Sequence, residues 1–333
     1  MENRIKERFK PVILEEALRR FGITPDHARL LNSFESFMYE IERDAQPYIL
    51  RIGHNLHRSE ALIQAEVDWI NYLGAGGASV AGAVLSAQGR LVEAIDDGRD
   101  GQFLATSFVK ARGRSPWVIG WSPALLETYG QLIGRMHRLS RNYRPTNLSW
   151  RRPHWDEPAL LDVERYLPAK ESIVLQKYRQ LVATLRTLPQ TVETYGLTHQ
   201  DAHGSNFFVD ETGHITLFDF DDCAYSWYAN DIAIILFYMI TNEVDAAAAT
   251  GEFMPGFLKG YGRENRLDPI WLKELPHFLK LREIELYAVI HRDFDVDHID
   301  NAWCAEFMEG RKARIEGDVP YVRFDFESLA GDV

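Results

Sequence analysis

The chain has 333 residues, 46% of them hydrophobic and 26% charged, with a formal net charge of −12 at pH 7. This length provides a substantial core and allows two lobes. The acidic balance argues against binding to nucleic acid, because no excess of Lys and Arg is available to release counterions. Two cysteines, Cys223 and Cys304, are too few for a disulfide framework or a cysteine zinc site. We expect a cytoplasmic protein, since the N-terminus lacks a signal region and the apolar run 232–240 is too short to span a bilayer.

The first third of the chain predicts a mixture of helices and strands. A helical pattern covers 14–21, and residues 37–53 are typical of two strands around a turn near Asp44 to Pro47. An amphipathic helix begins at Ser59 and ends at glycines. Two more strands, within 89–95 and 102–109, flank the turn-rich "DDGRDG".

Helices dominate after Lys110, beginning with a long helix over 123–140. A pair of strands around residues 206–220 is the exception. The pattern therefore predicts a sheet-rich first lobe and a helix-rich second lobe, joined near residues 107–113. The glycine-rich stretch at 74–82 is not a dinucleotide-binding loop, because Ser79 stands at the third glycine position and the stretch follows a helix.

The strand pair carries the most informative polar residues. "NFFVD" and "HITLFDF" flank "ETG", whose glycine suits a tight hairpin. If Thr212–Gly213 is a two-residue loop, Glu211 faces His214 and Asn206 lies opposite Asp219. Opposed side chains share a face of the sheet, with Cβ atoms roughly 5 Å apart. A longer turn would shift this register by a residue.

Carboxylates accompany this asparagine. Asp221 lies two residues beyond Asp219 and faces the same way, while Asp201 lies on the loop that leads into the hairpin. Oxygen ligands at this spacing suit Mg²⁺, which takes a few carboxylates together with phosphate and water. The hairpin therefore predicts a magnesium site.

The order of these residues resembles the catalytic core of the aminoglycoside phosphotransferase/choline kinase family. "HQDAHGSN" stands where that family often has "HGDLHPGN", and "LFDFDD" stands where it has "DFD" or "DLD". The resemblance implies an α+β, two-lobed, protein-kinase-like fold with a small β-rich N-terminal lobe and a larger, mainly helical C-terminal lobe. It places a nucleotide-binding lobe at 1–107 and a catalytic and substrate lobe at 108–333. The implied activity is phosphoryl transfer from ATP or GTP, with Mg²⁺, to a hydroxyl group.

The resemblance also implies a role for each matching residue of the second lobe. Asp201 would be the catalytic base, and Asn206 and Asp219 would hold Mg²⁺, with Asp221 as a further carboxylate. Two matching residues would be structural: His199, which packs the catalytic loop, and Asp231, which braces it. This chemistry suits phosphoryl transfer, which depends on positioning and charge neutralisation more than on a covalent nucleophile.

In the first lobe the resemblance implies a phosphate-binding Arg51, where the family has a basic residue, paired with Glu66 on the following helix. Without the second motif this pair would be interpreted as a surface ion pair. The phosphate-covering loop, near residues 31–39, contains no glycine and offers only Ser33 and Ser36 as small residues. The hinge "SFVKARG" would meet adenine through backbone groups of Val109 and Ala111.

The acceptor site of the family is built from the helical lobe, and the candidates here are aromatic and acidic: Asp222, Trp227, Tyr228, Glu283, Tyr287, Asp293 and Trp303. Such residues select an ammonium group through cation–π contacts and charge pairing, although each aromatic also suits a place in the core. We therefore expect a small hydroxyl compound that carries an amine: an amino alcohol, homoserine, a sugar amine or an aminoglycoside. Neither nucleic acid nor a membrane is expected as a partner, and the chain would be a monomer or a homodimer.

Three alternatives remain open. A protein Ser/Thr kinase is compatible with "DFDD", but no activation segment follows it. A pseudokinase binding module fits the glycine-free loop, but the set Asp201, Asn206 and Asp219 is intact. Finally, His199, Asp201 and His203 alternate as the ligands of a metallohydrolase could, without the further ligand pairs that such sites need.

Overall fold

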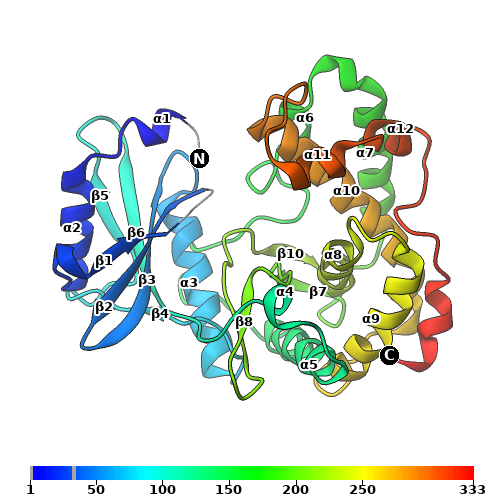
Figure 1. Ribbon diagram of the computed structural model, residues 1–333, viewed down its shortest axis with the longest axis horizontal. Coiled ribbons are helices and arrows are strands. Elements are labelled where there is room, and N and C mark those ends of the chain that lie inside the picture. The colour runs from blue at the N-terminus through cyan, green and yellow to red at the C-terminus, as the bar shows by residue number, and fades with distance from the viewer. Residues whose placement is uncertain (1–2, 32–34) are drawn as a thin grey trace. The chain divides into compact units, whose positions relative to one another are not determined.

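The computed structural model describes residues 3–31 and 35–333, which form two compact units (Figure 1). Unit 1 comprises Met1–Gly113, Tyr143–Arg152 and Thr216–Asp221. Unit 2 comprises Arg114–Asn142, Pro153–Ile215 and Asp222–Val333. Unit 1 contains a sheet and unit 2 is mainly helical, so the predicted α+β, two-lobed fold is confirmed. The boundary between residues 107 and 108 stays a prediction.

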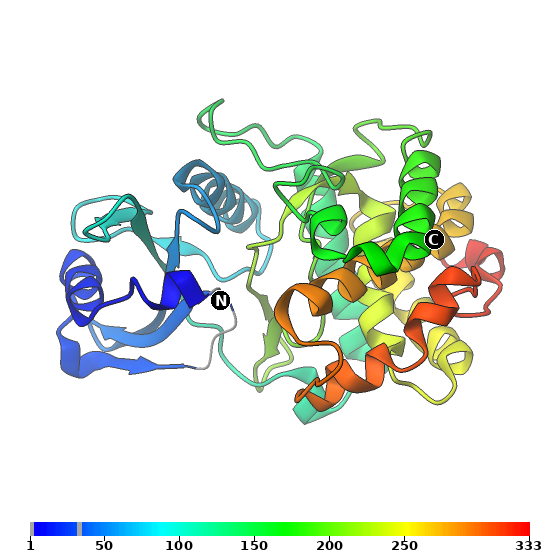
Figure 2. The ribbon, with the colours of Figure 1, turned by 90° about the horizontal axis from the view of Figure 1, so that it is seen from above.

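Unit 1 is built on an antiparallel sheet with the strand order β1-β2-β3-β6-β4, in which β5 also pairs with β6. Its strands are β1 (Ala28–Leu30), β2 (Phe37–Arg43), β3 (Gln46–His54), β4 (Ala83–Val84), β5 (Glu93–Asp96) and β6 (Gln102–Val109). The helices of the unit are α1 (Asn3–Lys6), α2 (Pro11–Phe21) and α3 (Glu60–Ala75). Figures 1 and 2 show the sheet between α2 and α3.

The β2–β3 hairpin places one basic side chain on the α3 face of the sheet. Its two-residue turn consists of Asp44 and Ala45, both with positive φ (53° and 57°), which matches the twist of the flanking strands. Leu50 and Ile52 are fully buried in the core formed with α2. Because side chains alternate along a strand, Arg51 between them points to the opposite face. The register of this hairpin thus determines where Arg51 lies.

Unit 2 contains the remaining helices around a two-stranded sheet of β7 (Tyr195–Thr198) and β10 (Ala224–Trp227). Its helices are α4 (Pro116–Ile119), α5 (Pro123–Ser140), α6 (Val163–Tyr166), α7 (Ser172–Leu185), α8 (Tyr228–Ile240), α9 (Ala246–Tyr261), α10 (Leu275–Asp293), α11 (Ala302–Met308) and α12 (Arg311–Glu316). Helix α8 packs against α9 and α10 and is buried on nearly every side, which explains its continuous apolar sequence. In the described part of the chain, every helix is too short or too polar to cross a membrane.

Helices α5 and α9 approach each other through glycines. A Cβ atom added at Gly130 would lie 1.9 Å from the carbonyl oxygen of Phe257, and one added at Gly260 would lie 1.9 Å from that of Glu127. Both obstacles are backbone atoms, so neither can move without moving a helix. The absence of a side chain at these two positions sets the spacing of the helix pair.

The hairpin of β8 (Phe207–Val209) and β9 (Ile215–Leu217) differs from the prediction. The amide of Asp210 donates to the carbonyl of His214 at 3.0 Å, so the connection has three residues and the predicted facing of Glu211 with His214 is wrong. The Asp210 carboxylate causes the longer turn, because its Oδ1 accepts from Thr212 N at 2.9 Å and from His214 N at 3.0 Å. The predicted register, in which Asn206 lies opposite Asp219, is therefore wrong by one residue.

Candidate active site

The loop between β7 and β8 is held in place by one buried carboxylate. Asp231, in the first turn of α8, accepts hydrogen bonds from the backbone N–H groups of His199 at 3.2 Å and Gln200 at 2.8 Å. It also bonds His137 Nε2 at 3.0 Å. Gln200 has a φ of 66°, a left-handed conformation that costs a non-glycine residue energy unless its surroundings enforce it. Asp231 thus fixes the backbone immediately before Asp201.

Both carboxylate oxygens of Asp201 have partners. Oδ2 accepts from Asn206 Nδ2 at 2.9 Å and lies 3.4 Å from His203 Nε2, while Oδ1 accepts from the guanidinium of Arg282 at 2.7 Å. Burial alone would raise the pKa of Asp201, but His203, Arg282 and His199 outweigh it and lower this pKa to about 2. Asp201 is therefore ionised at neutral pH and oriented by side chains from two elements.

Asn206 in unit 2 and Asp219 in unit 1 each carry an oxygen of the kind that binds Mg²⁺. The amide nitrogen of Asn206 donates to Asp201, which turns its oxygen away; within residues 3–31 and 35–333 that oxygen makes no hydrogen bond. Asp219 is exposed and has a φ of 64°. A strained backbone at an exposed carboxylate is typical of functional positions. An amide oxygen and an exposed carboxylate are hard ligands, as Mg²⁺ requires.

Arg51 and Glu66 form a buried ion pair, not a surface pair. The guanidinium donates to both carboxylate oxygens, at 2.8 and 2.6 Å, and the two residues are only 6% and 0% exposed. Burial would lower the pKa of Arg51, but Glu66 and then Asp221 and Asp219 raise it. A rigid, permanently charged fork of this kind suits phosphate oxygens as well as its carboxylate partner.

The carboxylate of Asp221 is surrounded by cations of unit 1. Arg58 Nε donates to its Oδ2 at 3.0 Å, and Arg51 lies 3.7 Å from its Oδ1. His57 Nε2 lies 3.6 Å from Asp221 and 3.3 Å from Glu35, and although burial lowers the pKa of His57, these two carboxylates raise it to about 9. Glu35, His57 and Asp221 bring potential ligand atoms within 4.8 Å of one another. Asp221 is thus already neutralised by protein groups of unit 1, and its role as a magnesium ligand stays a prediction.

Ser36, Val109 and Ala111 lie at or just beyond the ends of strands of the unit 1 sheet. Ser36 precedes β2, with its hydroxyl 3.5 Å from where a Cβ of Gly53 would stand. Ser33 lies outside the described residues. Val109 ends β6 and donates its N–H to the carbonyl of Gly82 at 2.9 Å, and Ala111 is buried. The contacts of Ser33, Val109 and Ala111 with a nucleotide stay predictions.

Most of the predicted acceptor residues are part of the core of unit 2. Trp227, Tyr228, Glu283 and Tyr287 are at most 3% exposed. The Glu283 carboxylate pairs with Lys280 and, at 2.8 Å, with Arg311. These contacts neutralise the carboxylate of Glu283, and the rings of Trp227 and Tyr287 are buried. Packing therefore explains Trp227, Glu283 and Tyr287 without an acceptor.

Asp222 and Trp303 are more accessible. Asp222 is half-buried and Trp303 is 38% exposed, with its ring 6.4 Å from that of Tyr238. Sequence reasoning missed two neighbours of this region on α10, Arg282 and Glu285. Burial, and then Asp222, raises the pKa of Glu285 to about 7, although Arg282 acts to lower it. No spacing rule points to these residues, because they lie about 80 positions beyond Asp201.

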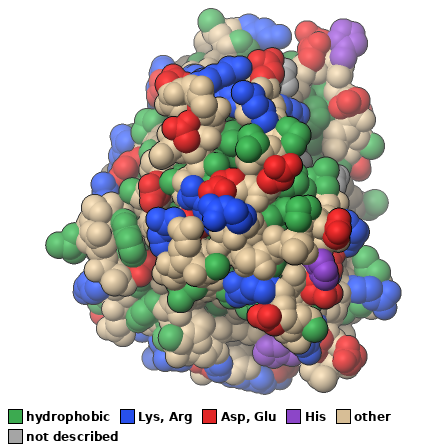
Figure 3. Space-filling model, turned by 90° about the vertical axis from the view of Figure 1, so that its left-hand side faces the viewer, with side chains coloured by type: hydrophobic (Ala, Val, Ile, Leu, Met, Phe, Trp, Pro, Cys, Tyr) green, Lys and Arg blue, Asp and Glu red, His purple; other side chains and the backbone are tan. Residues whose placement is uncertain are grey.

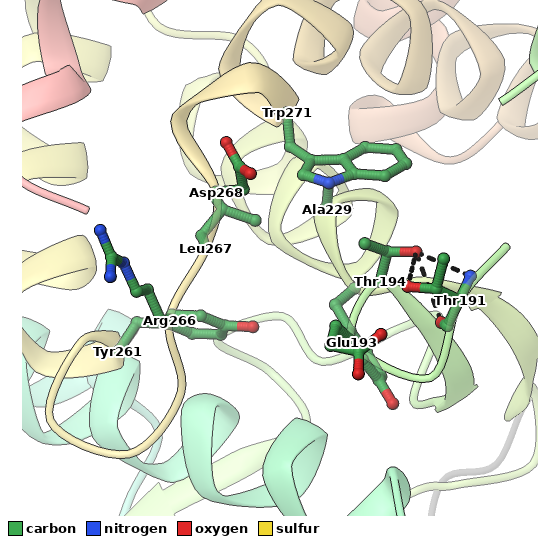
Figure 4. A pocket seen from close by; sticks show the side chains of 10 residues that line it. Thr191, Glu193, Thr194, Ala229, Tyr261, Arg266, Leu267, Asp268 and Trp271 are labelled. Carbon is green, nitrogen blue, oxygen red and sulfur yellow. Dashed lines mark hydrogen bonds between the residues drawn. The ribbon is translucent and has the colours of Figure 1, made fainter. Parts of the chain in front are cut away.

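A cavity of about 260 Å³ lies elsewhere in unit 2 (Figure 4). Trp271, Tyr261 and Asp268 line it together with Tyr228, which is the one predicted site residue on its walls among those that the structure describes. The predicted acceptor residues therefore do not come together in this cavity.

On the molecular face shown in Figure 3, acidic and basic side chains are interspersed.

Comparisons with known proteins identify relatives over nearly the full length. The model of a phosphotransferase enzyme family matches residues 27–275. Amicoumacin kinase of Bacillus subtilis (strain 168) is 40% identical over 321 residues, which are 95% of each chain. The solved structure of an amicoumacin kinase in complex with AMP-PNP, Ca²⁺ and Ami has a TM-score of 0.93 and 37% identity, and the alignment covers 99% of this chain and 100% of that one. A spectinomycin phosphotransferase, with 14% identity and a TM-score of 0.61, is similar in fold.

Proposed function

Because the chain belongs to the phosphotransferase enzyme family, we propose that it transfers the terminal phosphoryl group of ATP to a hydroxyl of a small, amine-bearing acceptor. The predicted family and the predicted activity class, an alcohol-accepting kinase of small molecules that uses ATP and Mg²⁺, are confirmed by its relatives. Amicoumacin is the first acceptor to test, since the 40% identical relative is named for it. The observation that carries the proposal is the arrangement of Asp201, Asn206 and Asp231.

In the proposed reaction Asp201 orients the acceptor hydroxyl and takes its proton. A carboxylate offers about four lone-pair sites, so Asp201 can accept this proton while Asn206 and Arg282 keep their hydrogen bonds. Its low pKa suits a loose transition state, in which the hydroxyl is aligned first and loses its proton late. Asp231 prevents the loop from relaxing out of this geometry.

The proposed ligands of the metal and the nucleotide are residues that the sequence predicted. Asn206 and Asp219 would bind Mg²⁺, which when bound neutralises charge on the phosphate oxygens. Arg51 would contact the phosphates while Glu66 keeps its guanidinium in one orientation. We assign Asp221 the task of holding Arg58 and His57 near Arg51.

For the acceptor we propose a smaller set of residues than the sequence indicated. Asp222 supplies negative charge, Glu285 supplies a carboxyl group whose pKa of about 7 leaves it partly ionised at neutral pH, and Trp303 supplies an exposed aromatic face next to Tyr238. An ammonium group would be stabilised by both. Trp303→Ala should therefore raise the KM of the acceptor and leave that of ATP unchanged; an unchanged acceptor KM would remove Trp303 from the site.

The deciding experiment measures ADP release with Mg·ATP across amicoumacin, amino alcohols, homoserine, aminoglycosides and a generic protein substrate. Asp201→Asn, which lacks the proposed base and should keep only a residual rate, serves as the control. Turnover that depends on one small acceptor and is lost in Asp201→Asn would support the proposal. Turnover with the protein substrate alone would show that the acceptor is a protein and not a small molecule. No turnover, together with no rise in melting temperature on adding Mg·ATP, would refute the proposed function.

A further inference from the structure

One arginine of α10 contacts the proposed catalytic base directly. The Nη2 atom of Arg282 donates to Asp201 Oδ1 at 2.7 Å and to the hydroxyl oxygen of Tyr238 at 2.8 Å. The guanidinium carbon also lies 5.3 Å from the centroid of the Tyr238 ring. The Arg282 side chain is 13% exposed. Its position is therefore defined by the protein and not by solvent.

Arg282 completes the restraint on the base. A carboxylate attached by two single bonds rotates over a broad range unless both of its oxygens are held. Asn206 and His203, from the same loop, act on Oδ2 of Asp201, whereas Arg282 acts on Oδ1 from another helix. Without Arg282, only Oδ2 of the Asp201 carboxylate would keep its partners, Asn206 and His203.

The arginine is itself held by its surroundings. Glu285, three residues further along α10, lies 3.8 Å from its Nη1, and the ring of Tyr238 packs on the guanidinium. Its Nε is buried and has no hydrogen-bond partner among the described residues. A guanidinium with an unsatisfied buried donor is a costly way to fill a core, since polar groups removed from water need partners. Packing alone is therefore a poor explanation for an arginine at this position.

Building on the proposed function, we propose that Arg282 is a positioning residue for Asp201, which it holds in the orientation that receives the acceptor hydroxyl. Arg282 acts through the base and does not bind the nucleotide. Its removal should therefore lower kcat and leave the KM of ATP unchanged. A misplaced base costs on the order of a hundredfold in rate.

The test compares Arg282→Ala with wild type in the acceptor reaction, with and without added guanidinium at a concentration that does not denature the protein. We expect kcat to fall roughly ten- to a hundredfold, and guanidinium to restore part of it by occupying the vacated space. Arg292→Ala, at the end of the same helix, is the matched control. It should keep the wild-type kcat and gain nothing from guanidinium. Arg282→Lys, which retains the charge without the planar fork, should fall between wild type and Arg282→Ala.

A double variant separates positioning from a general structural effect. If Arg282 acts through Asp201, adding Arg282→Ala to Asp201→Asn should reduce the residual rate no further. A wild-type kcat in Arg282→Ala would overturn the proposal. The proposal would also be overturned if guanidinium does not restore the kcat of Arg282→Ala and the double variant shows the product of the two single losses in rate. If Arg282→Ala does not fold, Arg282→Lys in the same double variant decides between these outcomes.

The pairing can also be tested without an acceptor. In thermal unfolding, Asp201→Asn and Arg282→Ala should be strongly non-additive, because either change alone leaves a buried charged group without its charged partner. Additive shifts in melting temperature would refute the pairing even if the kinase reaction is established. Conversely, a wild-type enzyme without any turnover would refute the proposed function, and the thermal unfolding of the two single variants and the double variant would then test the role of Arg282 independently.

Discussion

Asp231→Asn tests whether the catalytic loop depends on its buried carboxylate. Asp231 accepts three hydrogen bonds, from His137 and from the amides of His199 and Gln200. An asparagine of the same shape keeps one acceptor oxygen and turns an NH₂ group toward a donor. Hydrogen bonds to a charged group contribute roughly 1.5–3 kcal/mol each. We therefore expect a loss of about 3 kcal/mol in the free energy of unfolding, because at least one buried donor loses its partner.

Two measurements check this expectation. The melting temperature should fall by roughly 6 °C or more, and kcat should fall by about a hundredfold, since the left-handed conformation of Gln200 is no longer enforced before Asp201. The matched control is Asp245→Asn, an exposed N-cap of α9 whose side chain accepts from Ala248 N at 2.9 Å. Asparagine caps a helix as well as aspartate does, so this variant should behave like wild type. A stable and active Asp231→Asn variant would show that other contacts hold the loop.

Three further predictions address the rest of the molecule. Arg51→Lys loses one arm of a bidentate pair, so the KM of ATP should rise and the free energy of unfolding should fall by about 1–3 kcal/mol; wild-type values in a titration of ATP would contradict this. Gly130→Ala sets a methyl group 1.9 Å from the carbonyl oxygen of Phe257 and should lower stability by about 1–3 kcal/mol. Gly251→Ala in α9, whose nearest neighbour is 3.6 Å away, should be neutral or stabilising, and equal melting temperatures for both alanines would be inconsistent with the close approach. Hydrogen bonds to arginines of α5 lower the pKa of Glu264 to about 2, so its stabilisation is present above its ordinary pKa near 4.5 and lost as the pH falls through 2. Glu264→Gln should therefore cost about 1 kcal/mol at neutral pH and almost nothing near pH 2, and a pH-independent difference in urea unfolding would refute the assignment.

The features that sequence reasoning predicted well depend on residues that are close together in the chain. The family follows from residues 199–206 and 219–221, which stand in order on adjacent elements. The β2–β3 hairpin follows from its alternation, and α3 follows from Ser59, whose hydroxyl accepts from Leu62 N at 3.3 Å. In each case a local rule of geometry connects the residues, so a pattern alone is sufficient.

The features that it missed depend on distant partners. Glu283 lies on a helical face and has the residue type of an acceptor ligand, but in the structure its carboxylate pairs with Arg311, 28 residues further along the chain. Arg282 has no motif, because its relation to Asp201 exists only after α10 has packed. The prediction of the β8–β9 register was wrong for another reason. Asp210 accepts hydrogen bonds within its own turn and lengthens it, which the residues "ETG" alone do not predict.

The burial of α8 has a consequence for the order in which unit 2 loses its structure. Eleven of the thirteen residues from Tyr228 to Ile240 are buried, so the amide protons of this helix should exchange with solvent only when the unit opens as a whole. Asp231 belongs to that helix, and the catalytic loop is attached to it. The loop, although it is irregular backbone, should therefore share the slow exchange of the helix and not fray as surface loops do.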